Sequence, residues 1–149
     1  MGRTDEALEE MIGEFERYPK SAFHARNCGY LALKLDRIAE ARDFFSSWVE
    51  LDQDDPLAWI QYGLALKKEK RLPFAKVAFQ RAHELDVLRL QPILELARIA
   101  AVKKQEREVK KWLAKLKELI ADEHFLRVLG DAAFDGMESM KKELLDAAS

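Results

Sequence analysis

The feature that most constrains the fold of this chain is an internal repeat. When the sequence is shifted by 34 residues, several columns align, and small residues coincide at Gly29, Gly63 and Ala97. The other matching columns pair Ala41 with Ala75, Phe45 with Phe79, and Leu51-Asp52 with Leu85-Asp86. Because one shift serves every column, the chain is predicted to consist of tandem copies of one supersecondary unit.

The repeat divides the chain into three full copies, residues 22–55, 56–89 and 90–123. Each copy is predicted to contain two helices, which the local signals place at 22–35 and 38–51, 56–69 and 73–85, and 91–103 and 106–120. Pro56 and Pro73 suit the first turn of a helix, where a missing N–H costs nothing. The carboxylates of Asp54 and Asp55 stand where an N-cap oxygen is needed.

The second full copy carries the clearest pattern. Trp59, Tyr62-Gly63 and Leu66 mark its first helix, and Ala75, Phe79 and Ala82 mark its second. This pattern, at this period, resembles the tetratricopeptide repeat family. The resemblance covers residues 22–123 and a half repeat at 4–19. It implies an all-α chain, an α-solenoid of three tetratricopeptide-type helix-turn-helix repeats with flanking capping helices, in a single domain over residues 1–149.

The sequence departs from the family pattern at two kinds of column. The turn glycine common in the family is replaced by Asp36, Lys70 and Lys104, so strained or altered turns are expected there. Trp48 stands where the next repeat has Ala82, so the packing of the first repeat is expected to differ.

The two ends of the chain match the repeat only partly. Residues 4–17 place Leu8, Met11, Ile12 and Phe15 on one helical face, and they are predicted to cover the apolar flank of the first full repeat. Residues 124–149 are predicted to form C-terminal capping helices, with Asp131 as the N-cap of a helix that runs to about residue 145. The apolar side of that helix would be Phe134, Met137, Met140 and Leu144.

The resemblance also implies where a partner would bind, because first helices of successive repeats line a concave groove in this family. The corresponding positions form the candidate partner-binding groove: Phe23, Arg26, Asn27, Tyr30, Leu33, Leu57, Ile60, Gln61, Leu64, Lys67, Leu94 and Arg98. Many of them are apolar at positions that core packing does not claim, and an exposed apolar patch needs an explanation. Either the groove takes an apolar or amphipathic partner segment, or the C-terminal helix or a second copy fills it.

Some family members clamp a C-terminal carboxylate of heat-shock chaperones with basic residues and asparagines. The matching columns here hold Arg26, Tyr30, Gln61, Gln91 and Glu95. Glu95 would repel a carboxylate, so this type of ligand is not expected.

The sequence shows no pattern typical of catalysis. Cys28 lies in a core column beside Gly29 and is expected to be a buried thiol. His24, His83 and His124 fall in different repeats without ligand spacing, so no metal and no cofactor is predicted. No glycine-rich nucleotide loop is present. The chain is therefore predicted not to be an enzyme.

Charge and hydropathy narrow the range of partners. The net charge is −2, and the basic stretch at 103–117 is typical of a solvated helix face, so no nucleic-acid partner is expected. No apolar run reaches the ~20 residues of a membrane span. The cytoplasm is the expected compartment, and the initial half repeat leaves open that the chain is part of a longer array.

These observations predict a protein-protein interaction adaptor or scaffold that binds an apolar or amphipathic partner segment in its groove. Two alternatives remain. One is a bacterial secretion chaperone of the tetratricopeptide type, a family that also uses three repeats at about this size. The other is a self-assembling structural repeat protein.

Overall fold

The computed structural model describes residues 2–147. The chain divides into two compact units, the first ending at Leu85 and the second beginning at Asp86. The first unit contains α1 (Gly2–Arg17), α2 (Ala22–Lys34), α3 (Ile38–Leu51), α4 (Pro56–Lys68) and α5 (Leu72–Leu85). The second contains α6 (Leu90–Val102), α7 (Glu106–Leu119), α8 (Asp122–Leu129), the short 3₁₀ helix η1 (Ala132–Phe134) and α9 (Glu138–Asp146). Residues 2–147 contain no β-strand, so the all-α prediction is confirmed.

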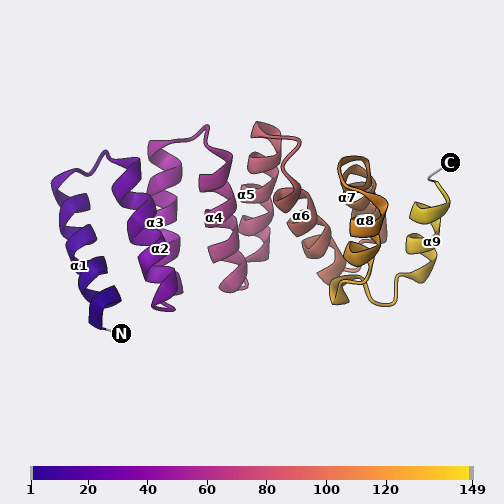
Figure 1. The fold of residues 1–149 in the computed structure, drawn as a ribbon, viewed down its shortest axis with the longest axis horizontal. Coiled ribbons are helices and arrows are strands. Elements are labelled where there is room, and N and C mark those ends of the chain that lie inside the picture. Colours follow the sequence, from indigo (N-terminus) through magenta and orange to yellow (C-terminus); the bar gives the residue numbers. More distant parts are fainter. Residues whose placement is uncertain (1, 148–149) are drawn as a thin grey trace. The chain divides into compact units, whose positions relative to one another are not determined.

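The six helices predicted for the full repeats are all present, and each predicted end agrees with the structure to within one residue. Their pairing follows the repeat, because α2 packs on α3, α4 on α5, and α6 on α7 as antiparallel neighbours (Figure 1). Local signals fix several helix starts. The Leu57 amide donates to Oδ1 of Asp55 at 2.9 Å before Pro56, and the His24 amide donates to Oγ of Ser21 at 3.4 Å.

The glycine columns are close contacts with an aromatic ring. A Cβ added to Gly29 would lie 2.3 Å from Cε1 of Phe45, and one added to Gly63 would lie 2.8 Å from Cε1 of Phe79. Both phenylalanines are fully buried, so neither ring can move aside easily. Glycine is therefore required where α2 crosses α3 and where α4 crosses α5.

Trp48 makes the first repeat pack differently from the second, as the sequence predicts. Its indole is buried, and its ring centroid lies 6.1 Å from that of Phe45 and 6.2 Å from that of Tyr30. Such tilted and edge-to-face contacts are the favoured geometries of aromatic pairs. The first repeat thus has an aromatic core in a column where the second repeat has Ala82.

The three turns between paired helices adopt the conformation that glycine would favour. Asp36, Lys70 and Lys104 have φ values of 58°, 60° and 54°, which lie in the left-handed region. Side chains with a Cβ are strained there, so the expectation of strained turns at these columns is confirmed.

Helix α1 covers the first full repeat in the way that its sequence predicts. Leu8 is fully buried, and Met11, Ile12 and Phe15 pack against the same core. The ring of Phe15 meets that of Phe44 edge-on, with a centroid distance of 6.3 Å. The helix therefore removes from water the apolar flank that α2 and α3 would otherwise expose.

The predicted continuous helix from Asp131 to about residue 145 is wrong. The Asp131 carboxylate instead caps η1, accepting the Ala133 amide at 2.9 Å, and α9 begins only at Glu138. Gly136 between them has a φ of 82°, which no α-helix can contain. The four predicted apolar positions of this segment are nevertheless all buried: Phe134, Met137, Met140 and Leu144.

Candidate partner-binding surface

A cavity in the first unit brings together part of the predicted groove. It lies between α2 and α4, has a volume of about 350 Å³, and is lined by Leu33, Gln61, Leu64, Lys67 and Lys68. Two leucines supply its apolar wall, and an amide and two ammonium groups supply its polar rim. Four of these five residues belong to the groove set derived from the sequence.

Lys68 lines the cavity but was not predicted from the sequence. It follows Leu64 by four positions on α4, and side chains at that spacing share one helical face. The spacing was therefore a signal that could have identified it. Its side chain is exposed, which places a positive charge next to the apolar wall.

The N-terminal half of α2 presents a different surface. Phe23 is 56% exposed, and the guanidinium carbon of Arg26 lies 5.5 Å from its ring centroid. The same guanidinium lies 5.9 Å from the ring of Trp48, so Arg26 is held by two aromatic faces. Asn27 is half-buried on the same helix, and none of these three residues lines the cavity.

Tyr30 and Leu57 contribute to the core as well as to the surface. The ring of Tyr30 packs against that of Phe45 at 5.4 Å, and Leu57 is a partly buried member of the same cluster. Burial raises the pKa of the Tyr30 hydroxyl, with Arg26 acting to lower it and Asp55 to raise it. Tyr30 therefore stays a neutral hydrogen-bonding group at neutral pH.

Ile60 does not lie on an open surface, contrary to its place in the predicted groove. Its side chain is 0% exposed. The reason is that α4 is apolar on more than one side, with Ala58, Ile60 and Leu66 all buried. A helix of that kind is covered by its neighbours over most of its circumference.

The second unit also departs from the predicted groove. Leu94 is half-buried, but Arg98 is engaged within the chain, with Nη2 2.7 Å and Nε 3.0 Å from Oδ2 of Asp131. Its Nη1 donates to Oε1 of Glu95 at 2.8 Å, and Glu95 is only 4% exposed. Burial acts to lower the pKa of Arg98, but the hydrogen bonds to Asp131 and Glu95 outweigh it and raise that pKa. Arg98 thus holds the C-terminal segment rather than rimming an open groove.

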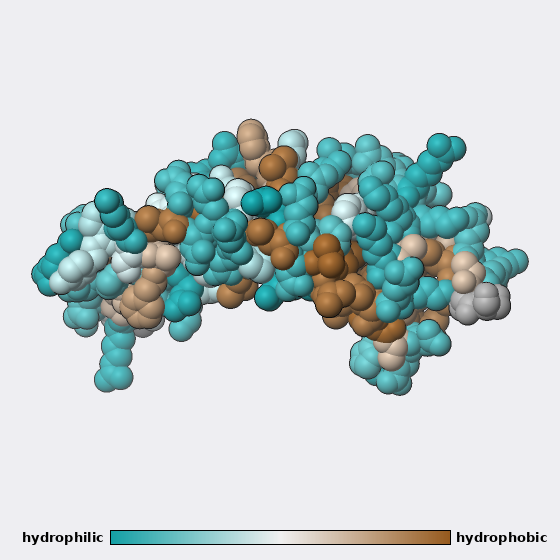
Figure 2. All heavy atoms as spheres, turned by 90° about the horizontal axis from the view of Figure 1, so that it is seen from above, coloured by the Kyte–Doolittle hydropathy of each residue, from teal (hydrophilic) through white to brown (hydrophobic). Residues whose placement is uncertain are grey.

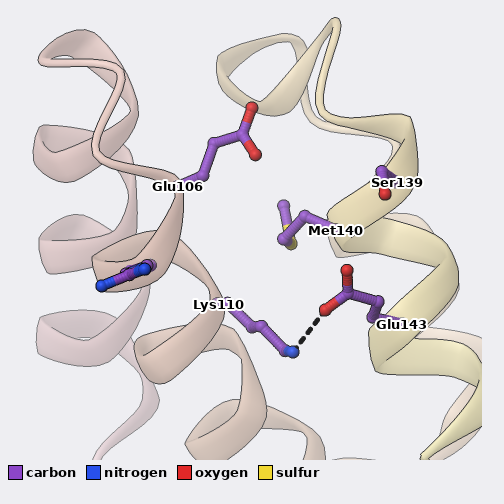
Figure 3. Close-up of a pocket in the computed structure, with 6 residues that line it drawn as sticks. Glu106, Lys110, Ser139, Met140 and Glu143 are labelled. Atoms are coloured by element: carbon purple, nitrogen blue, oxygen red, sulfur yellow. Dashed lines mark hydrogen bonds and ion pairs between the residues drawn. The ribbon is translucent and has the colours of Figure 1, made fainter.

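A second cleft lies between α7 and α9 and has a volume of about 290 Å³. Its walls carry Glu106, Arg107 and Lys110 from α7 and Ser139, Met140 and Glu143 from α9 (Figure 3). Lys110 and Glu143 form an ion pair across it. The two bases and two acids balance, so this cleft has no net charge to attract a charged ligand.

Exposed apolar residues gather at the start of the second unit. Val87, Leu88 and Leu90 are all exposed. Hydrophobic side chains also gather on the face of the molecule shown in Figure 2. No helix within residues 2–147 is long and apolar enough to cross a membrane.

The single cysteine of the chain and its possible metal ligands were the remaining chemical groups of interest. Cys28 is fully buried, and burial raises the pKa of its thiol to about 11, so the reactive thiolate is scarce at neutral pH. Within residues 2–147, no group of three or more His, Cys, Asp or Glu side chains is placed to hold a metal ion. The predicted buried thiol is confirmed.

No family model and no curated protein sequence matches the chain. Solved structures do. MamA is 17% identical, with 97% of this chain and 82% of that chain covered at a TM-score of 0.80. YrrB, a tetratricopeptide repeat protein with an unusual peptide-binding site, is 16% identical. The match covers 99% of this chain and 79% of YrrB at a TM-score of 0.73. SycD, a type III secretion chaperone of Yersinia enterocolitica, was solved in complex with a peptide of the translocator YopD. It is 16% identical, and the match covers 80% of this chain and 91% of SycD at a TM-score of 0.67.

These similarities define the class of the chain as a helical repeat protein. Its fold is that of the tetratricopeptide repeat proteins, as the repeat columns predict. At such low sequence identities, the similarity shows the fold alone. It does not identify binding-site residues of this chain from those of the other proteins.

Proposed function

We propose that this chain is a non-catalytic adaptor that binds a peptide segment of another protein on the α2–α4 side of its first unit. The observation that carries this proposal is the cavity lined by Leu33, Leu64 and Lys68, since an apolar wall beside exposed positive charge suits an amphipathic segment with acidic residues. Two similar structures point the same way, because YrrB is described by its peptide-binding site and SycD holds a peptide of YopD.

The size of the cavity limits how tightly it can bind alone. Burying two leucine-sized side chains against Leu33 and Leu64 is worth roughly 3–6 kcal/mol before costs. Association removes several kcal/mol of this. A segment that occupies only the cavity would therefore bind weakly, and useful affinity requires further contact along α2. Phe23, exposed near the start of that helix, is the candidate second anchor.

The proposal can be tested with a panel of fluorescein-labelled synthetic peptides that carry two or three leucine or phenylalanine anchors separated by aspartate and glutamate. Fluorescence anisotropy should show saturable binding, and Leu64→Asp should weaken it by at least about tenfold through lost apolar burial. Lys68→Glu should weaken it less and reduce its salt dependence, because this exposed lysine contributes orientation and association rate.

Leu126→Asp is the matched control, because Leu126 is an exposed leucine of α8 in the other unit. It should leave peptide binding unchanged. Melting curves of all three variants should remain cooperative. Equal binding by the Leu64→Asp variant and the unchanged chain would show that the cavity is not the site.

A secretion chaperone is a second candidate, favoured by the similarity to SycD over 80% of this chain. The two candidate functions differ in their effect on the bound protein. An adaptor binds its segment and leaves the rest of the partner folded, whereas a chaperone keeps an aggregation-prone partner soluble. Light scattering of an apolar client protein, with and without the chain, separates the two.

A further inference from the structure

The outward face of α5 carries two large apolar side chains that the core does not use. Phe74 is 61% exposed and Val77 is 59% exposed. They are three positions apart on the helix, so they lie next to each other on one face. Both belong to α5, whereas the cavity described above is formed by α2 and α4.

The repeat itself shows that this pair is unusual. In the column of Phe74, the first and third repeats have Glu40 and Glu108. In the column of Val77, they have Asp43 and Lys111. Equivalent columns serve the same structural purpose in each helix pair, and charged residues satisfy it twice. The apolar pair on α5 is therefore not required by the fold of a repeat.

Positive charge lies next to the apolar pair, at the start of α5. Residues 70–82 contain Lys70, Arg71, Lys76 and Arg81 and no acidic residue. The guanidinium carbon of Arg71 lies 5.4 Å from the ring centroid of Phe74. Arg81 is paired with Glu84 at 3.3 Å, but no ion pair within residues 2–147 neutralises Lys70, Arg71 or Lys76.

We propose that this face of α5 is a second interaction surface, which binds an acidic amphipathic segment of another protein. Phe74 and Val77 would contact the apolar side of that segment, and Lys70 and Arg71 would face its carboxylates. Apolar contact then supplies affinity, while the charges set orientation and association rate. An adaptor with this surface could hold two protein segments at once.

The acidic helix α1 of a second copy does not fit the surface. This helix has the right charge, but the side chains that it exposes over residues 2–17 are charged, apart from two glycines. Phe74 and Val77 would lie against glutamates, and burying glutamates against apolar groups is unfavourable. The partner must instead carry apolar and acidic residues together.

An anionic membrane fits less well than a peptide. In α3 of the same unit, the positions equivalent to Phe74 and Val77 are occupied by Glu40 and Asp43. A flat headgroup layer would bring these carboxylates close to lipid phosphates, which costs energy, whereas a narrow segment lying along α5 avoids them.

The test uses the full chain and a fluorescein-labelled amphipathic peptide with leucines at helical i, i+3/i+4 spacing and glutamate at its other positions. The double variant Phe74→Glu with Val77→Asp places on α5 the residues that the first repeat has in these columns. It should therefore fold normally. When both chains also carry Leu64→Asp, so that the α2–α4 cavity does not contribute, the α5 variant should bind the peptide at least about tenfold more weakly. A peptide with lysine in place of glutamate should not bind.

The Leu64→Asp variant separates this site from the α2–α4 cavity, because it should leave binding to α5 intact. Loss of all binding in Leu64→Asp, with none lost in the α5 variant, would overturn the α5 site and leave the cavity standing. Equal binding of the glutamate and lysine peptides would also overturn it. So would binding to vesicles of phosphatidylserine and phosphatidylcholine that depends on Phe74, or a Phe74-dependent dimer in sedimentation equilibrium.

Discussion

The helix pairs α4–α5 and α6–α7 occupy the same columns of the repeat but fill them differently. The first has Gly63 against the ring of Phe79, while the second has Ala97 and Leu113 in the equivalent columns, both fully buried. The leucine side chain in the second pair leaves room for the methyl group of alanine, whereas the phenylalanine ring in the first pair does not. The difference predicts that the two columns are coupled, so that the small residue and its partner change together.

The two units differ in a similar way on their groove sides. In the first unit, Leu33 and Leu64 line a cavity. In the second, the corresponding helix α6 contacts η1, and Arg98 binds Asp131. The same helix type therefore offers space in one unit and is engaged by the chain's own C-terminal segment in the other.

The largest expected effect tests the coupled columns. Gly63→Ala should lower the free energy of unfolding by about 1–3 kcal/mol, because its Cβ would lie 2.8 Å from the Phe79 ring. Gly29→Ala should cost more, since the corresponding distance is 2.3 Å. Adding Phe79→Leu to Gly63→Ala reproduces the third repeat and should recover part of the loss. Urea titration measures these three variants and Phe79→Leu alone, and strictly additive losses would contradict the coupling.

Helix positions in this chain could be predicted from the sequence because local signals determine them. Prolines, capping carboxylates and the repeat period are all near in sequence, so the six repeat helices were predicted almost to the residue. The strained turns at Asp36, Lys70 and Lys104 were predictable for the same reason. The break at Gly136 also had a local signal, since glycine favours positive φ.

The open surface could not be predicted as well, because it depends on which side chains tertiary packing covers. Ile60 has the spacing of a groove residue but lies on a helix that is buried on several sides. Arg98 pairs with Asp131, which lies 33 positions further along the chain. No local pattern reveals such a contact. Four residues of the predicted groove line one cavity in the structure: Leu33, Gln61, Leu64 and Lys67.

An intermediate effect is expected when the C-terminal segment loses its ion pair. Asp131→Ala removes both hydrogen bonds to Arg98 and the cap of η1, and should cost about 1–2 kcal/mol. Hydrogen exchange should rise over residues 130–147 and stay unchanged in the first unit. Glu123→Ala, at an exposed acid of α8, is the control and should fall within about 0.5 kcal/mol of zero. Unchanged exchange in the Asp131 variant would mean that the other contacts of the segment, such as its apolar packing and the Lys110–Glu143 ion pair, hold it without Asp131.

The smallest expected effect concerns the three left-handed turns. Lys70→Gly and Lys104→Gly should each stabilise the chain, because glycine adopts φ values near 60° and 54° without a clash at Cβ. The gain should be only about 0.5–1 kcal/mol, since glycine also adds entropy to the unfolded state. Asp36→Gly should gain less, because aspartate tolerates this region better than lysine does. Thermal melting would show rises of roughly 2–4 °C for the lysine variants. A fall in melting temperature at Lys70 or Lys104 would mean that the lysine side chain stabilises its turn by more than the strain that it causes.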